Sequence, residues 1–254
     1  MMTTETLTEK DTLWDNVKSL FYAILLAILI RTVWLQPFYI PSGSMIPTLL
    51  IGDNLFVSKT AYGYSRYSIP FGGSIDYFSG RIWSAEPKLG EVAVFRSVME
   101  PETDYIKRVV GVPGDRIQMK GGILHINDVP CPVDPAGEFE TVNDNGTLLK
   151  APQYTETLPN GLKHLILKKD PFGVGTYDNT AVFEVPAGHY FMMGDNRDGS
   201  NDSRAQDVVT YIPLENFVGR ASFIFFSTGG KIALWEIWQW PFTAHYSRIF
   251  QGIH

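Results

Sequence analysis

Ser44 has the sequence setting of a candidate nucleophile. It lies in the segment PSGSMIPTL (41–49), where Gly43 permits close approach of the backbone and the prolines limit flexibility. A serine hydroxyl is a weak nucleophile until a neighbouring base takes its proton. The segment therefore predicts a stiff turn that presents a hydroxyl, and a functional interpretation requires a basic partner elsewhere in the chain.

Lys107, in the segment DYIKRVVGVPGD (104–115), is a candidate for that base. On an alternating strand it shares a face with Tyr105 and Val109, and the strand continues into apolar residues. Apolar surroundings favour the neutral amine, because desolvation penalises the ammonium ion. A neutral amine can act as a general base, and Ser–Lys pairs are a variant of the catalytic triad. The alternative is a lysine on a solvated face.

A histidine base is the other alternative for activating the serine. None of the histidines lies in a recognisable catalytic setting, and the patterns G-x-S-x-G, S-x-x-K and H-E-x-x-H are absent. The members of a Ser–His–Asp triad need not be close in sequence, so that arrangement stays open. The histidines are His125, His164, His189, His245 and His254.

The segment GDNRDGSNDSR (194–204) combines carboxylates with guanidinium groups. A calcium loop of the EF-hand type requires Asp or Asn where Arg197 stands, so this spacing argues against calcium. We expect instead a self-neutralising network of ion pairs that stiffens a turn, with Ser200 offering a hydroxyl to a nearby amine. The charged members of the network are Asp195, Asp198 and Asp202 against Arg197 and Arg204.

An apolar segment precedes these motifs. Residues 20–30 are all apolar, and the stretch 13–35 reaches the ~20 residues that a membrane-spanning helix needs. Arg31 can extend toward the interface, and Trp34 suits the headgroup region. The acidic residues before the segment and the lack of a small-x-small site after it argue against a cleaved signal peptide. We predict an uncleaved membrane anchor; a buried helix of a soluble protein is the alternative.

Beyond this segment the pattern is mainly that of β-strands. Alternating or β-branched runs predict strands at 90–95, 104–112, 189–196 and 219–227, and a hairpin over 116–128 that turns at residues 120–122. Residues 129–188 are rich in Pro, Gly, Asn and Asp, which indicates a β/loop-rich insertion. The expected fold class is mainly β, with small antiparallel sheets packed together behind one N-terminal transmembrane helix.

Composition excludes some partners. The net charge of −6 gives no basic surface, so we expect no nucleic acid. Cys131 is the single cysteine, so the chain has no intrachain disulfide. The tail KIALWEIWQWPF (231–242) brings Trp235, Trp238 and Phe242 to roughly one helical side, which predicts either contact with membrane lipid or packing on the domain core.

Taken together, the motifs resemble the conserved boxes of bacterial type I signal peptidase, the leader peptidase. The membrane segment before the first box is similar as well, and the resemblance covers roughly residues 20–118 and 186–225. The segments that carry it are PSGSMIPTL, GDNLFVSK (52–59), DYIKRVVGVPGD and GDNRDGSNDSR.

The resemblance implies a membrane-bound serine endopeptidase that removes signal peptides from exported preproteins through an acyl-enzyme, with no metal or other cofactor. Ser44 would be the nucleophile and Lys107 its general base. Ser42 would contribute to the oxyanion hole, and Ser200 would orient the lysine. The remaining implied residues are Phe38, Ile40, Leu49, Tyr105 and Ile106 in the substrate pockets and Asp195, Arg197, Asp202 and Arg204 in structural support.

The resemblance also implies an organisation and a location. Residues 1–36 would form a cytoplasmic tail and a single-pass anchor in the bacterial inner membrane, with the catalytic domain on the outer, periplasmic side. The other parts would be the catalytic core in two pieces (37–118 and 189–230), the insertion subdomain (119–188) and the C-terminal aromatic tail (231–254). The chain departs from some members, which have two spans or a disulfide. A non-catalytic, membrane-tethered β domain that binds a partner is the alternative function.

Overall fold

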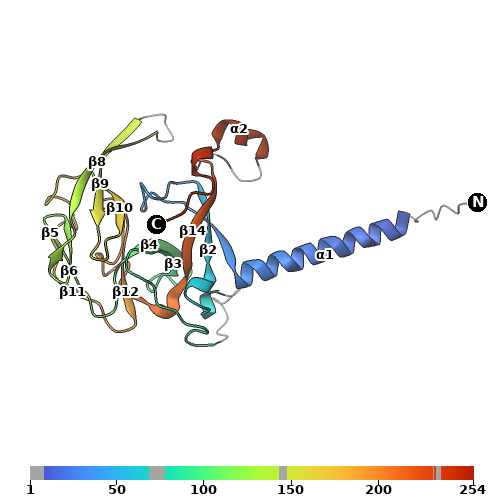
Figure 1. The fold of residues 1–254 in the computed structure, drawn as a ribbon, viewed down its shortest axis with the longest axis horizontal. Helices are drawn as coiled ribbons and strands as arrows, with labels where there is room; N and C mark the ends of the chain where they lie inside the picture. The colour runs from blue at the N-terminus through green and yellow to red at the C-terminus, as the bar shows by residue number, and fades with distance from the viewer. Residues whose placement is uncertain (1–8, 69–77, 143–147, 231, 233–235) are drawn as a thin grey trace, which may run out of the picture.

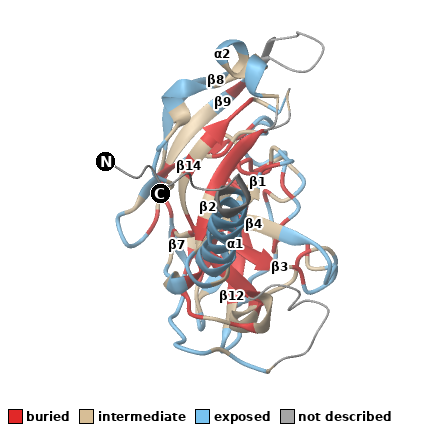
Figure 2. Cartoon of the chain, turned by 90° about the vertical axis from the view of Figure 1, so that its right-hand side faces the viewer, coloured by how far each residue is buried: buried red, intermediate tan, exposed pale blue. Residues whose placement is uncertain are grey.

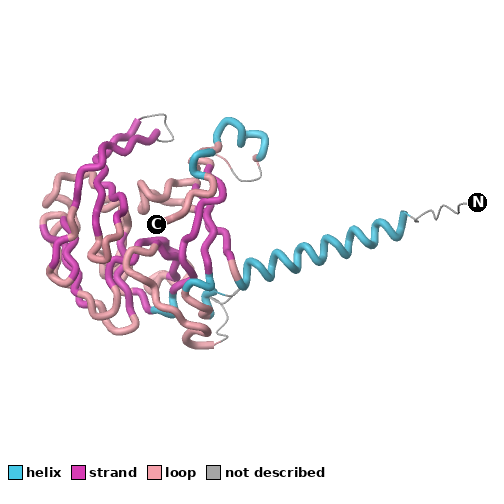
Figure 3. Tube along the Cα trace, in the orientation of Figure 1, coloured by secondary structure: helices cyan, strands magenta, loops and turns pink. Residues whose placement is uncertain are grey.

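The computed structural model describes residues 9–68, 78–142, 148–230, 232 and 236–254. Within these residues it is mainly β, with three antiparallel sheets, which confirms the expected fold class. One long helix, α1 (Glu9–Val33), projects away from the β region (Figures 1 and 3). A short helix, α2 (Trp240–Thr243), lies near the C-terminus.

The largest sheet has seven strands in the order β1-β2-β14-β3-β4-β12-β13. It carries the expected strands at 90–95, 104–112, 189–196 and 219–227, with ends that shift by a few residues. Its members are β1 (Leu35–Tyr39), β2 (Asp53–Ser58), β3 (Val92–Arg96), β4 (Asp104–Gly111), β12 (His189–Met193), β13 (Ile212–Pro213) and β14 (Phe217–Ser227). Pro37 lacks a backbone N–H, and its strand β1 lies at the edge of this sheet, where a strand tolerates proline.

A four-stranded sheet contains the expected hairpin. Its strands are β5 (Arg116–Lys120), β6 (Ile123–Ile126), β7 (Val129–Pro130) and β11 (Phe183–Glu184). Gly121 and Gly122 form the turn with φ values of 57° and 82°, a region that favours glycine. Alternate side chains of β5 and β6 are buried against one apolar cluster, which explains the period of two in their sequence.

Three further strands occupy part of the tract 129–188, in which sequence analysis named no individual strand. They are β8 (Val133–Val142), β9 (Leu148–Thr157) and β10 (Lys163–Leu167), and they form a three-stranded sheet. Prolines and charged residues interrupt the apolar alternation in β8 and β9, so pattern alone did not reveal them. The two smaller sheets lie on the side of the β region opposite α1 (Figure 1).

From residue 13 to residue 31, no described part of the chain covers helix α1, and its C-terminal end meets the β region. The stretch Leu13–Val33 has a mean hydropathy of 1.6, long and apolar enough to cross a membrane. Every side chain from residue 13 to residue 31 is exposed within the chain (Figure 2). The alternative of a buried helix in a soluble protein is therefore wrong, because none of the described residues covers this apolar surface.

The C-terminal tail leaves several aromatic side chains uncovered. Trp238 is 66% exposed and Phe242 is 88% exposed, so these two do not pack on the domain core. Trp235, the third residue of the expected aromatic side, lies outside the described residues.

Candidate active site

Ser44 lies in a buried turn that follows β1. Met45 and Leu49 of this turn are fully buried in an apolar cluster with Leu55 and Val57 of β2. The packing of these two side chains in the core fixes the position of the turn. Ser44 itself is 8% exposed. The stiff turn that the prolines predicted is therefore also a packed one.

Asn196 holds the same turn from the other side. Its side-chain Nδ2 donates to the carbonyl oxygen of Gly43 at 2.9 Å, and its backbone N–H donates to that of Ser44 at 3.1 Å. Sequence analysis did not single out Asn196, because nothing in the local pattern distinguishes a surface asparagine from one that bridges two distant segments.

Lys107 reaches the turn from β4. It pairs with Ala93 of β3 in the middle of the large sheet, and its side chain is almost completely buried, with 3% exposure of the residue. Its Nζ lies 5.4 Å from the centroid of the Tyr105 ring, so Lys107 and Tyr105 share a face as the alternation predicted. The alternative of a lysine on a solvated face is wrong.

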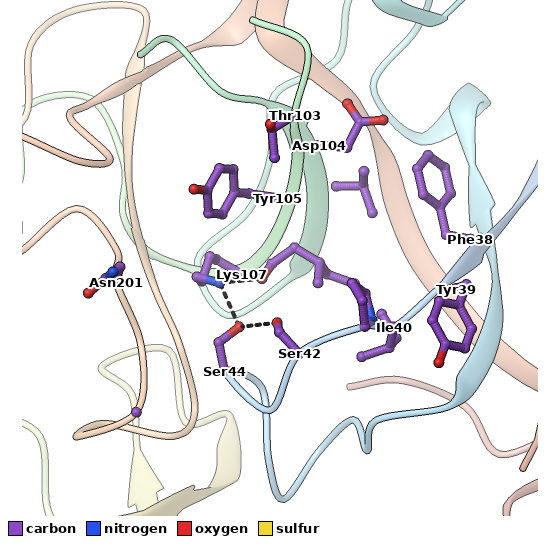
Figure 4. A pocket seen from close by; sticks show the side chains of 14 residues that line it. Phe38, Tyr39, Ile40, Ser42, Ser44, Thr103, Asp104, Tyr105, Lys107 and Asn201 are labelled. Carbon is purple, nitrogen blue, oxygen red and sulfur yellow. Dashed lines mark hydrogen bonds between the residues drawn. The ribbon is translucent and has the colours of Figure 1, made fainter. Parts of the chain in front are cut away.

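The two candidate reacting groups touch. Lys107 Nζ lies 2.7 Å from Ser44 Oγ, and Ser42 Oγ lies 3.5 Å from the same oxygen (Figure 4). The carbonyl oxygen of Ile106 accepts a second hydrogen bond from Lys107 Nζ at 3.1 Å. Among the described residues the side-chain partners of Ser44 Oγ are thus Lys107 and Ser42, and no histidine hydrogen-bonds to it.

Burial lowers the pKa of Lys107 to about 8, from an ordinary value of 10.5. Loss of hydration is the largest cause, because it penalises the ammonium form. Asp202 and Asp195 act against this effect, and Arg204 adds to it. The geometry thus gives a substantial neutral fraction near physiological pH at the atom next to the serine hydroxyl.

The loop 194–204 is fixed by buried ion pairs, most of which reach beyond the loop. Asp195 accepts two hydrogen bonds from Arg108, at 2.8 and 2.7 Å, and a third from Thr48 at 2.5 Å. Burial alone would raise the pKa of Asp195, but the charge and hydrogen bonds of Arg108 outweigh it and lower the pKa. Arg108 is the neighbour of Lys107 on β4, so this pair ties the loop to the strand that carries the amine.

Arg197 pairs with a residue of the insertion. Its Nη1 lies 2.7 Å from Glu156 Oε1, and its Nη2 contacts the other carboxylate oxygen. His164 Nε2 lies 3.1 Å from Glu156 Oε2, and all three side chains are buried. Burial acts to raise the pKa of Glu156, but Arg197 and His164 outweigh it and lower that pKa to about 2.

The prediction that the charges of this loop neutralise one another is therefore wrong in part, because most of them pair with residues outside the loop. Asp202 and Arg204 do pair within the loop, at 2.8 Å. Asp198 instead accepts from Lys168 at 2.6 Å, and Asp195 and Arg197 pair with Arg108 and Glu156. Four of the partners that sequence analysis missed are Arg108, Glu156, His164 and Lys168. Pairing between segments far apart in the chain depends on the tertiary fold, and composition alone cannot reveal it.

Ser200 lies in this region but does not hydrogen-bond to the lysine. Its residue is 4% exposed, and its Oγ has no hydrogen-bond partner among the described residues. It packs against Gly194, where a Cβ atom would lie 2.2 Å from Ser200 Oγ and 2.5 Å from the carbonyl oxygen of Ser44. Gly194 is thus required for the close approach of the loop to the serine turn.

A cavity of about 350 Å³ opens beside the pair. Four of the five expected pocket residues line it, namely Phe38, Ile40, Tyr105 and Ile106 (Figure 4). The fifth, Leu49, lies in the apolar core with no exposed surface and does not line the cavity. The other lining residues are Tyr39, Pro41, Ser42, Ser44, Val94, Thr103, Asp104, Lys107, Gly199 and Asn201.

Within the described ranges no group of three or more His, Cys, Asp or Glu side chains has the arrangement of a metal site. Among the polar side chains that line the cavity, the hydroxyl of Ser44 and the amine of Lys107 are in direct contact. This pair suits transfer of an acyl group to the serine oxygen.

Comparison with known proteins assigns a family to these features. The family model "Signal peptidase, peptidase S26" matches residues 13–226. The chain is 38% identical over 258 residues to a signal peptidase I of Rickettsia typhi, covering 96% of this chain and 95% of the relative. It is 43% identical over 237 residues to a signal peptidase I of Rickettsia canadensis, covering 92% of this chain and 86% of the relative.

A solved structure of a signal peptidase I from Enterococcus faecalis covers 54% of this chain and aligns over 97% of its own, with 19% identity and a TM-score of 0.30.

The buried pair of Arg108 and Asp195 gives a stability prediction. Replacing Arg108 by Met leaves a buried carboxylate without its counter-charge, and breaking such a pair costs about 3–5 kcal/mol. We expect a loss of this size in the free energy of unfolding, measured by urea denaturation of the detergent-solubilised protein. The matched control is Arg116→Met, because the pair of Arg116 with Asp128 is exposed and its loss costs roughly 0–1 kcal/mol. Equal losses in the two variants would contradict the role assigned to the buried pair.

Proposed function

The chain belongs to the signal peptidase family, peptidase S26, and from this premise we propose that Ser44 and Lys107 are its catalytic pair. The protein is a membrane-anchored serine endopeptidase that removes signal peptides from preproteins. The observation that carries the assignment is the 2.7 Å contact between Ser44 Oγ and a buried Lys107 Nζ. The alternative of a non-catalytic binding domain is not favoured, because a hydrophobic binding surface requires no such pair.

In the proposed first step, neutral Lys107 Nζ takes the proton of Ser44 Oγ, and the oxygen attacks the scissile carbonyl carbon. Negative charge then develops on the carbonyl oxygen, where hydrogen-bond donors lower the barrier. Ser42 Oγ lies beside Ser44 Oγ and is the proposed side-chain donor, together with the Ser44 backbone N–H. The C–N bond breaks as the Lys107 ammonium returns a proton to the leaving amine of the mature chain.

In the second step, Lys107 takes a proton from a water molecule that attacks the ester on Ser44. The tetrahedral intermediate collapses, the ester bond breaks, and the signal peptide leaves as a carboxylate while Ser44 regains its proton. Every proton moves between groups of the chain, substrate and water, so this route requires no metal or organic cofactor. Ser200 is proposed to orient Lys107 during these steps, which requires a rotation of its free Oγ toward the amine.

The structural support for this site is proposed to include the insertion. Residues of β9 and β10 hold the loop 194–204 through Glu156 and His164, and Leu167 exchanges backbone hydrogen bonds with residues 195 and 197 at 2.8 and 2.9 Å. Asp195, Arg197, Asp202 and Arg204 then act by fixing the loop that carries Asn196, which in turn holds the Ser44 turn.

We also propose a single-pass location in the bacterial inner membrane, with the β region on the outer, periplasmic side. Signal peptides are cleaved there after export, and α1 joins the β region directly.

The exposed Trp238 and Phe242 are proposed to contact lipid, since aromatic side chains favour the membrane interface. Nucleic acid is not among the proposed partners, because the net charge of −6 is unfavourable for binding a polyanion. Protease added to intact spheroplasts tests the side, and resistance of the β region there would contradict it.

The catalytic pair gives a first functional prediction. Ser44→Ala should abolish cleavage of a preprotein, and Lys107→Ala should reduce kcat/KM by at least 10²–10⁴, the usual cost of losing a general base. Lys107→Arg should also fail, because guanidinium stays protonated. His125→Ala and His189→Ala are controls that should retain near-parental turnover, as neither histidine lines the cavity. Near-parental turnover of Lys107→Ala would overturn the Ser–Lys assignment.

The buried amine gives a prediction on pH. Only neutral Lys107 can accept the serine proton, and its pKa is lowered to about 8. The value of kcat/KM should therefore rise with pH, roughly tenfold per unit below that pKa, and level off above it. Initial rates on a soluble peptide from pH 6 to 10 measure this limb. A flat profile over that range would show that Lys107 does not titrate in the free enzyme as proposed.

The cavity gives a prediction on specificity. Ile40, Tyr105 and Ile106 are bulky residues that leave a shallow apolar site. A precursor with Ala before the scissile bond should be cleaved far faster than the same precursor with Phe, as expected for the A-x-A-like pattern of signal-peptide cleavage sites. Mass spectrometry of the products gives both the rates and the position of the cut. Equal rates for the two precursors would rule out this assignment of the pocket.

A further inference from the structure

The junction between the anchor helix and the catalytic sheet contains no flexible linker. Helix α1 ends at Val33 and strand β1 begins at Leu35, so Trp34 alone separates them. The last four carbonyl groups of a helix have no partner within the helix, and unpaired carbonyls are costly near the hydrocarbon of a bilayer. Partners for this helix end must therefore come from elsewhere.

The β region supplies partners for two of these carbonyls, and the backbone N–H of Trp34 donates to that of Ile30 at 2.8 Å. Lys59 Nζ donates to the carbonyl oxygen of Thr32 at 3.5 Å, and the Tyr64 hydroxyl donates to that of Val33. The backbone N–H of Lys59 donates to the carbonyl oxygen of Trp34 at 3.0 Å, which continues the β1–β2 ladder up to the helix. We name Lys59 and Tyr64 the anchor joint.

The position of Lys59 is unusual for a lysine. The residue is 2% exposed. Among the described residues, its ammonium group donates hydrogen bonds to the backbone carbonyl oxygens of Thr32 and Ser68. Burial, and to a smaller extent the charge of Arg31, lower the pKa of Lys59 to about 8. A cation is favourable at the negative end of the helix dipole, which accounts for an ammonium group at this point.

Tyr64 is itself held firmly. Its backbone exchanges two hydrogen bonds with Ile82, at 2.9 and 2.8 Å, and its ring meets that of Trp83 edge to face at 6.0 Å between centroids. The hydroxyl that caps Val33 is thus carried by a fixed element of the β region.

The chain from the joint to the nucleophile is also fixed at each step. Every residue of β1 pairs with β2, from Leu35 opposite Ser58 to Tyr39 opposite Asn54. Ile40 then exchanges backbone hydrogen bonds with Asp53 and Gly52, both at 2.9 Å, and the packed turn with Ser44 follows. The direction of α1 in the membrane therefore determines where Ser44 lies above the bilayer.

We propose that Lys59 and Tyr64 are positioning residues that join the anchor helix rigidly to the catalytic sheet and so set the height of Ser44 above the membrane. This inference rests on the proposed function of Ser44. A membrane-inserted precursor places its scissile bond at a fixed height as well, so the joint matters for that substrate. A soluble peptide can diffuse to the site at any height, so the joint does not matter for it.

The test compares the two kinds of substrate in one set of liposomes that hold the full-length enzyme. The variants are Lys59→Met, which keeps the stem and removes the ammonium group, Tyr64→Phe, and the two combined. The matched controls are Lys88→Met at an exposed position and Tyr246→Phe, whose hydroxyl donates to the carbonyl oxygen of Trp240 away from the joint. A second readout is the distance distribution between nitroxide labels at Leu26→Cys and Lys163→Cys, with the buried Cys131 replaced by Ala in every protein.

For the combined variant we expect kcat/KM on the soluble peptide to stay within about twofold, and cleavage of the inserted preprotein to fall at least about tenfold, since small misplacement of reacting groups is costly. The label distances should broaden in the same variant and stay unchanged in the controls. The single variants should show smaller changes in the same direction.

Three results would overturn the inference. Equal losses on both substrates would show that the two residues support the fold of the domain rather than its position. Unchanged preprotein cleavage would show that the height of Ser44 is not limiting, whatever the labels report. Lost preprotein cleavage with unchanged label distances would show a cause other than the joint. Failure of the proposed function is distinct, because the parent protein would then cut the peptide no faster than Ser44→Ala.

Discussion

The structure depends on burying one amine next to one hydroxyl, which lowers the pKa of the amine to about 8. A lysine at full hydration is protonated near neutrality and cannot accept the proton of Ser44, so the 2.7 Å contact is chemically useful only inside a dry sheet. The centre of the large sheet provides that environment, because β4 is paired on both sides and Lys107 is 3% exposed. The same burial lowers the local dielectric constant, so each neighbouring buried charge needs an opposite charge or hydrogen bonds beside it.

The buried ion pairs around the site meet this requirement. Asp202 and Asp195 act to raise the pKa of Lys107, whereas Arg204 acts with burial to lower it. Each carboxylate is itself paired, Asp195 with Arg108 and Asp202 with Arg204. Burial without partners would be prohibitive for such groups, and a buried pair is tolerated when its hydrogen bonds are complete. The insertion contributes to the same balance through Glu156, which neutralises Arg197. A tract that looks like a surface appendage in sequence is thus part of the support of the site.

The anchor helix joins the large sheet without a flexible linker, because only Trp34 separates α1 from β1. Its apolar side chains are exposed along the whole span, so the bilayer rather than the protein satisfies them. The carbonyl groups of Thr32 and Val33 at its end accept hydrogen bonds from the β region, and β1 continues directly toward the turn of Ser44. In the proposed arrangement the membrane is the reference plane for the site, as it is for substrates that are themselves held in the membrane.

The sequence by itself determined the parts of the protein that depend on local pattern. Apolar length identified the anchor, and alternation identified β3, β4, the β5–β6 hairpin, β12 and β14. The settings of Ser44 and Lys107 made each a candidate, and the resemblance to a known family joined them as a pair. These signals are local because strand period and helix length are properties of neighbouring residues. The strands β8 and β9 escaped detection because prolines and charges mask their period.

The tertiary structure decided which distant groups meet. It paired Asp195 with Arg108 and Arg197 with Glu156, brought Asn196 to the carbonyl groups of the serine turn, and placed Leu49 in the core rather than in the cavity. No local pattern encodes these contacts, since a charged or amide side chain has many possible partners of the right chemistry. The choice among them depends on strand order and register, which bring segments more than a hundred residues apart into contact at one site.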